Sequence, residues 1–173
     1  MTQSLVLTVI GDDRHGLVEK LASTISKHEG NWLESSMSRL AGKFAGIVRI
    51  EVPDEHATRL NKALAELPEL RVIVEAGGPE HPSVAGVRFT LQLVGHDRIG
   101  IVREVTTVLA RHAVNVEKLV TGTASAPMSA EMLFKADAEL KADPDFNIDA
   151  LQSDLERISA DLMVDIDLIR ADS

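Results

Sequence analysis

Residues Val9 to Val18 read Val-Ile-Gly-Asp-Asp-Arg-His-Gly-Leu-Val, and residues Leu93 to Val102 read Leu-Val-Gly-His-Asp-Arg-Ile-Gly-Ile-Val. The two stretches superimpose without a gap at an offset of 84 residues (95 − 11). The identical pairs continue downstream and comprise Gly11 and Gly95, Asp13 and Asp97, Arg14 and Arg98, Gly16 and Gly100, Val18 and Val102, His28 and His112, and Asn31 and Asn115. Self-similarity at a fixed spacing marks a repeated structural unit, and two copies are too few for a solenoid. The sequence therefore predicts two homologous domains.

Each copy alternates between strand-like and helix-like segments. Ser4 to Ile10 is a short apolar run typical of a buried strand. From Gly16 the apolar residues recur at the spacing of one helical face, and Phe44 to Val52 alternates as a half-buried strand does. The full order is strand, helix, strand, strand, helix, strand. Right-handed crossovers favour one fold for this order, the ferredoxin-like sandwich. We expect an α+β protein with two tandem ferredoxin-like (βαββαβ) domains, each an antiparallel four-stranded sheet with both helices on one face.

The expected domain boundaries follow the Gly- and Pro-rich stretch Gly77 to Ser83. They give a first domain at 1–76, a linker at 77–86 and a second domain at 87–173. In the second domain we expect a hairpin of Val114 to Thr123 with Ala130 to Asp137, an acidic loop from Lys141 to Phe146, and a helix capped by Asn147. A domain of this size buries only roughly 60–65% of its unfolded surface. We therefore expect homo-oligomers or packing between the halves, and the exposed sheet edges leave both pairings open.

Composition excludes several classes of function. The net charge is −9 and the 18 Lys and Arg residues are scattered, which argues against direct binding of nucleic acid. There is no cysteine for a disulfide or a thiolate metal site. The N-terminus lacks the pattern of a signal peptide, and no apolar run approaches the ~20 residues that span a bilayer. These features predict a soluble cytoplasmic protein that does not enter a membrane.

The repeated turn is the candidate binding site. Its glycines bring backbone N–H groups close to a ligand, and helix N-termini favour anions such as a carboxylate. An Asn side chain offers donors and an acceptor, and if it lies adjacent to the turn it suits an amino-acid zwitterion. The candidate ligand-binding residues are Asp13, Arg14, Gly16, Asn31, Asp97, Arg98, Gly100 and Asn115.

Structural interpretations of the same residues stay open. Asp13 and Asp97 are then plain helix N-caps, the two Arg side chains are solvated or paired with carboxylates, and Asn31 and Asn115 tolerate a left-handed backbone. No known catalytic motif occurs, neither His-Glu-x-x-His, Gly-x-Ser-x-Gly nor Gly-x-x-x-x-Gly-Lys. We expect no catalytic residue, no metal site and no cofactor.

The pattern Gly-x-Asp-Arg-x-Gly-(Ile/Leu)-Val, followed by a helix and an Asn that opens the next strand, resembles the ACT domain, a ferredoxin-like regulatory module that often binds amino acids. Two such domains in about this length resemble the glycine cleavage system transcriptional repressor family, as does the segment Thr121 to Phe134. The resemblance implies a non-enzymatic repressor that contacts a LysR-type transcriptional activator and responds to glycine or another amino acid. Two alternatives are a regulatory module of an amino-acid or one-carbon enzyme system and a ligand-free dimerisation module.

Overall fold

The computed structural model describes residues 1–78, 86–127 and 131–170. The chain divides into two compact units, residues 1–81 and 82–173, which we call the first and second domains. Most of the predicted linker and residues 128–130 and 171–173 lie outside the described residues. The domain boundaries predicted from the sequence therefore stay a prediction.

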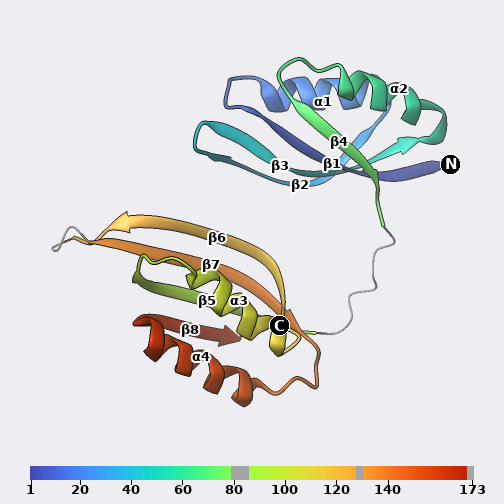
Figure 1. Ribbon diagram of the computed structural model, residues 1–173. Helices are drawn as coiled ribbons and strands as arrows, with labels where there is room; N and C mark the ends of the chain where they lie inside the picture. The colour runs from blue at the N-terminus through green and yellow to red at the C-terminus, as the bar shows by residue number, and fades with distance from the viewer. Residues whose placement is uncertain (79–85, 128–130, 171–173) are drawn as a thin grey trace. The chain divides into compact units, whose positions relative to one another are not determined.

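The first domain has the predicted order of elements (Figure 1). Its elements are β1 (Thr2–Asp12), α1 (Leu17–Lys27), β2 (Asn31–Leu40), β3 (Lys43–Pro53), α2 (Asp54–Ala65) and β4 (Arg71–Ala76). The four strands form an antiparallel sheet in the order β2-β3-β1-β4. The strand nearest the chain start therefore lies inside the sheet, which confirms the ferredoxin-like prediction.

The second domain repeats this topology. Its elements are β5 (Val87–His96), α3 (Ile101–Arg111), β6 (Asn115–Ser125), β7 (Met132–Ala142), α4 (Ile148–Leu162) and β8 (Val164–Arg170). The antiparallel strand order is β6-β7-β5-β8. Even an irregularity recurs, because the register shifts between Trp32 and Glu34 in β2 and between Val116 and Lys118 in β6. The repeat in sequence is thus a repeat in backbone detail.

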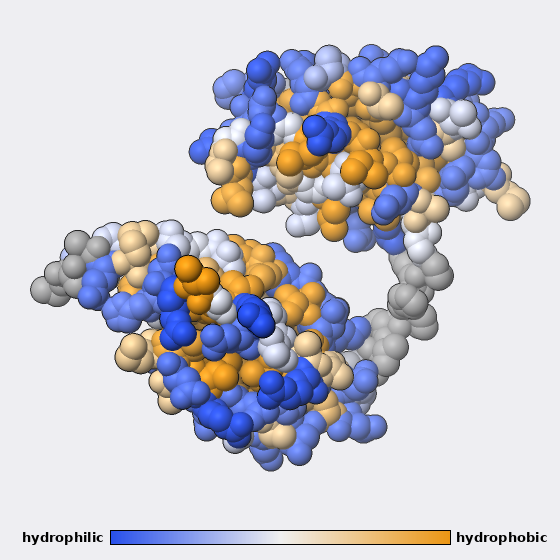
Figure 2. All heavy atoms as spheres, in the orientation of Figure 1, coloured by the Kyte–Doolittle hydropathy of each residue, from blue (hydrophilic) through white to orange (hydrophobic). Residues whose placement is uncertain are grey.

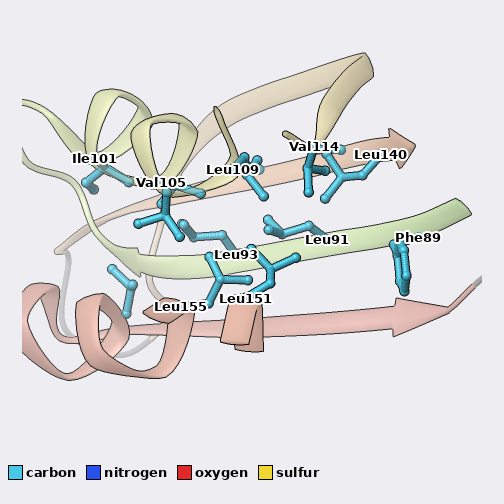
Figure 3. Close-up of a cluster of buried hydrophobic side chains, with 14 of the residues drawn as sticks. Phe89, Leu91, Leu93, Ile101, Val105, Leu109, Val114, Leu140, Leu151 and Leu155 are labelled. Carbon is cyan, nitrogen blue, oxygen red and sulfur yellow. The ribbon is translucent and has the colours of Figure 1, made fainter. Parts of the chain in front are cut away.

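Each domain has its own aliphatic core. Alternate residues of the inner strands and one face of each helix are buried together, as the period-2 and period-3.6 patterns require. Figure 3 shows this for the second domain, where side chains of β5, α3 and α4 converge, among them Leu93, Val105 and Leu151. The two clusters share no residue. The opposite face of each sheet carries no helix of its own domain.

Two local predictions were wrong and one was confirmed. The predicted acidic loop begins too early, since β7 continues through Ala142, whose side chain is buried. Asn147 caps α4 as predicted, and its Oδ1 accepts a hydrogen bond from the Ala150 N–H at 3.0 Å. The sequence also predicts that Gly30 ends the first helix, as glycine often does in a left-handed conformation, but Glu29 takes that conformation instead (φ 59°). A Cβ on Gly30 would instead lie 2.7 Å from Cγ2 of Ile25, so close packing explains this glycine.

Candidate functional site

The repeated turn joins the end of the first strand of each domain to its first helix. Gly16 is the N-cap residue of α1 and has φ 84°, and Gly100 has φ 94° at the start of α3. This left-handed conformation is one that glycine adopts without strain and that other residues adopt at a cost. The backbone conformation therefore explains why glycine occupies both positions. These glycines precede the helix rather than lying in its first turn.

The interpretation of Asp13 and Asp97 as N-caps was wrong. Gly16 and Gly100 occupy the N-cap positions of α1 and α3, and neither helix has a side-chain cap there. The N–H of Asp13 donates to the Gly42 carbonyl at 2.9 Å, and that of Asp97 donates to the Met132 carbonyl at 3.0 Å. Asp13 also accepts a hydrogen bond from Nη1 of Arg39 at 3.3 Å. Both residues therefore fasten the turn to the neighbouring hairpin.

The start of α1 is open to solvent. The first N–H groups of a helix have no partner inside the helix, and the helix dipole makes that end attract anions. Next to it lies a hollow of about 400 Å³ lined by Asp13, Arg14, His15, Gly16, Leu17, Val18, Glu19 and Phe44. The structure thus brings Asp13, Arg14 and Gly16 together, as predicted. Their arrangement is able to hold a small carboxylate.

The two Lys side chains near the first turn are each paired with a carboxylate. Lys20 pairs with Glu69, and Lys43 pairs with Asp12. The hydrogen bond and charge of Lys20 hold the pKa of Glu69 below its ordinary value, and Lys43 does the same for Asp12. The charge of Arg14 lowers the pKa of both carboxyl groups by a smaller amount, so Arg14 lies near Asp12 and Glu69.

The second turn carries its charged residues in a different order from the first. Glu104 occupies the position of Lys20 at the same offset of 84 (104 − 20). Its Oε1 lies 3.9 Å from Nη2 of Arg98 and 3.8 Å from where a Cβ on Gly100 would sit. A carboxylate of the protein itself therefore lies beside the second turn. The repeat alignment contains the reverse exchange at the preceding position, where Arg103 matches Glu19 (103 − 19), so the two exchanges reorder the charges and leave their sum unchanged.

The two Asn residues lie away from the turns, against the prediction. Asn31 is the first residue of β2 and pairs with Glu51 of β3, which in turn pairs with Ser4 of β1. Asn31 therefore lies level with the start of β1, whereas the turn follows Asp12 at the end of β1. The eight residue steps from Ser4 to Asp12 (12 − 4) span roughly 26 Å of strand. The reason is that α1 runs back along the sheet, so the next strand starts at the opposite end. Asn115 has the same position in the second domain. Neither Asn has a left-handed backbone, so that interpretation was also wrong.

A metal site has no support among the described residues. No group of three or more His, Asp or Glu side chains there is placed to hold a metal ion.

In the part of the chain that the structure describes, no helix is both long and apolar enough to span a bilayer.

Comparison with known proteins identifies the repeated unit. The family model of the ACT domain matches residues 3–77 and again 88–168. An unknown protein from Galdieria sulphuraria has a similar crystal structure, with a TM-score of 0.89 and 29% identity over 99% of this chain and 100% of that one. A second crystal structure, of a protein whose ascribed role is glycine cleavage system transcriptional repressor, has a TM-score of 0.74 and 18% identity over 100% of this chain and 99% of that one. A search of curated proteins finds no match. The chain therefore belongs to the ACT domain family, of which it carries two tandem copies.

Proposed function

We propose that this protein is a non-enzymatic, amino-acid-responsive regulator and that its effector binds at the first turn. The observation that carries this proposal is the uncapped start of α1 beside a hollow of about 400 Å³. The effector's carboxylate accepts hydrogen bonds from the N–H groups at the start of α1, which the helix dipole strengthens. Asp13 and Glu19 line the same hollow and suit the effector's ammonium group.

The difference between the two turns supports one effector per chain. Glu104 places a carboxylate beside the second turn, whereas Lys20, at the equivalent position of the first, pairs with Glu69. A ligand carboxylate at the second turn would meet a like charge within the range where such charges repel. Asn31 and Asn115 lie too far from the turn of their own domain to contact an effector bound there.

The regulated process we propose is the glycine cleavage system, with glycine or a related amino acid as effector. The protein then restrains a LysR-type transcriptional activator by direct contact, as a homo-oligomer in the cytoplasm. The full-length similarity in fold to a protein with this ascribed role supports the proposal. The net charge of −9 supports contact with a protein rather than with nucleic acid.

Thermal unfolding with each of the twenty amino acids tests the effector. Trp32 is the one Trp of the chain and packs against the first core, so its fluorescence follows the domain with the proposed site. A ligand at 100 times its dissociation constant adds about 2.7 kcal/mol, which raises Tm by about 10–20 °C for a domain of this size. We expect one amino acid, or a few close relatives, to raise Tm.

Three variants separate binding from folding. Gly16→Asp leaves no steric clash, because no atom lies within 4 Å of the new Cβ, but it puts a carboxylate in the site. We expect it to abolish the ligand-induced shift and to lower the basal Tm by about 4–16 °C, because a residue other than glycine adopts φ 84° at a cost of about 1–2 kcal/mol. Lys20→Glu copies the second turn and weakens binding, whereas Glu104→Lys leaves the Trp32 response unchanged. If no amino acid raises Tm, the protein is a ligand-free protein-binding module and the effector proposal is wrong.

A further inference from the structure

The sheet of the first domain has one face that carries neither α1 nor α2. We call it the open face of the first sheet. It comprises Glu34, Ser36 and Ser38 of β2, Ala45, Ile47 and Arg49 of β3, Val6, Thr8 and Ile10 of β1, and Arg71, Ile73 and Glu75 of β4. In its middle row Thr8 pairs with Ile47 on one side and Ile73 on the other. Ile47 is 54% exposed and Ile73 is 53% exposed. A row of exposed β-branched side chains on a sheet is the mark of an interaction surface.

The second domain shows that the fold does not require this apolar row. At the equivalent positions Gln92 pairs with Asp137 on one side and Asp167 on the other. Gln92 Nε2 donates to Asp137 Oδ1 at 3.3 Å, so these side chains form a polar, acidic row. Figure 2 shows hydrophobic residues at the surface of both domains. Of the two sheets, the first places an isoleucine on each side of the central residue of its middle row, Thr8. The two faces therefore differ in what they can bind.

We propose that the open face of the first sheet binds the same face of a second copy of this chain. The twofold axis lies between the two sheets and runs across the strands. Aligned sheets pack about 10 Å apart with their strands within about 30° of each other. A twofold axis makes one patch serve both copies, so the middle row of one copy covers the middle row of the other.

The charges on either side of the middle row favour this axis. On one side of the middle row lies the row of Arg49, Val6 and Glu75. On the other side lies the row of Ala45, Ile10 and Arg71. An axis across the strands exchanges these rows, so Glu75 of each copy faces the partner's Arg71. An axis along the strands would instead set Glu75 against Glu34, since β4 would cross β2. Glu34 already pairs with Arg49 at 3.4 Å, so that arrangement would give Glu75 a like charge to face and no new cation to pair with.

The size of the face fits a dimer of moderate affinity. The strands β1, β2, β3 and β4 have 11, 10, 11 and 6 residues. At 3.3 Å per residue and 4.8 Å between strands they cover roughly 600 Å² per copy. Two copies bring together roughly 1,200 Å², at the lower limit for specific interfaces. The second sheet cannot pair in this way, because Asp137 and Asp167 would face their own copies.

Sedimentation of the full chain without any amino acid tests the proposal independently of effector binding. At about 50 µM we expect a mass near twice 18.7 kDa for the wild type. Ile47→Asp with Ile73→Asp copies the second sheet and weakens the dimer by more than ~100-fold, since it buries unpaired carboxylates. Ile169→Asp is the matched control, because Ile169 is 52% exposed on the second sheet, and it keeps the dimer. Far-UV circular dichroism checks that each variant is folded.

A charge exchange tests the axis. Arg71→Glu alone and Glu75→Arg alone each weaken the dimer, and the double variant restores it. A monomeric wild type at 50 µM, or a dimer that the two isoleucine substitutions leave intact, overturns the proposal. If the double variant fails to restore what the single variants lose, the axis across the strands is wrong.

Discussion

Two separate cores predict that damage to one domain leaves the other folded. Leu64 of α2 and Leu151 of α4 are each fully buried (0% exposed), one in each domain and on equivalent helices. Replacing either with alanine removes buried methyl groups and leaves a cavity, which costs roughly 2–5 kcal/mol. Because the clusters share no residue, each loss falls on one domain.

The loss is large against the stability of so small a domain. About 80 residues at 0.05–0.15 kcal/mol per residue amount to roughly 4–12 kcal/mol. For a domain of this size each kcal/mol shifts Tm by about 4–8 °C, so a loss of about 3 kcal/mol lowers Tm by about 12–24 °C. We expect Leu64→Ala to lower the Tm of the first domain by this amount, and Leu151→Ala that of the second.

Two optical signals distinguish the outcomes. Fluorescence of Trp32 reports the first domain only, whereas far-UV circular dichroism reports both. Leu64→Ala shifts the fluorescence transition, and Leu151→Ala shifts part of the dichroism transition while the fluorescence transition stays in place. Equal shifts of Trp32 fluorescence in the two variants would mean that the chain unfolds as one cooperative unit, which would refute the reasoning.

Four further substitutions test single positions. Gly46→Ala destabilises the first domain, because the new Cβ would lie 2.2 Å from the Ser36 carbonyl oxygen, whereas Gly122→Ala meets no atom within 4 Å and keeps Tm within about 2 °C of the wild type. Asn147→Ala removes the cap of α4 and costs about 1 kcal/mol, seen by dichroism but not by Trp32. The hydrogen bond from His112 lowers the pKa of Asp154 below 3.8, so this carboxylate contributes stability that is complete above that pH and is lost as pH falls through the lowered pKa. Between about pH 5 and pH 2 the Tm of the second domain therefore falls less steeply in Asp154→Asn than in the wild type, and equal slopes would contradict this assignment.

Local pattern in the sequence determined the order of elements, the two domains and most of the core. Alternation along β3 and helical spacing along α1 each depend on which residues of one segment are apolar, and burial follows from that. Leu21 and Ile25 are buried as their spacing predicts. The ferredoxin-like topology followed because few arrangements of these elements obey the rules of handedness and connection.

The site depended on chain direction and register, which local pattern does not contain. Asn31 lies at the far end of the sheet because α1 runs antiparallel to β1, and Asp13 bonds the hairpin because the turn passes beside it. The apolar row of Ile47, Thr8 and Ile73 exists only once three strands are paired in register. Residues far apart in the chain became neighbours there through backbone hydrogen bonds between strands. Tertiary structure alone therefore decided which repeated residues share a site and which face is free to bind a partner.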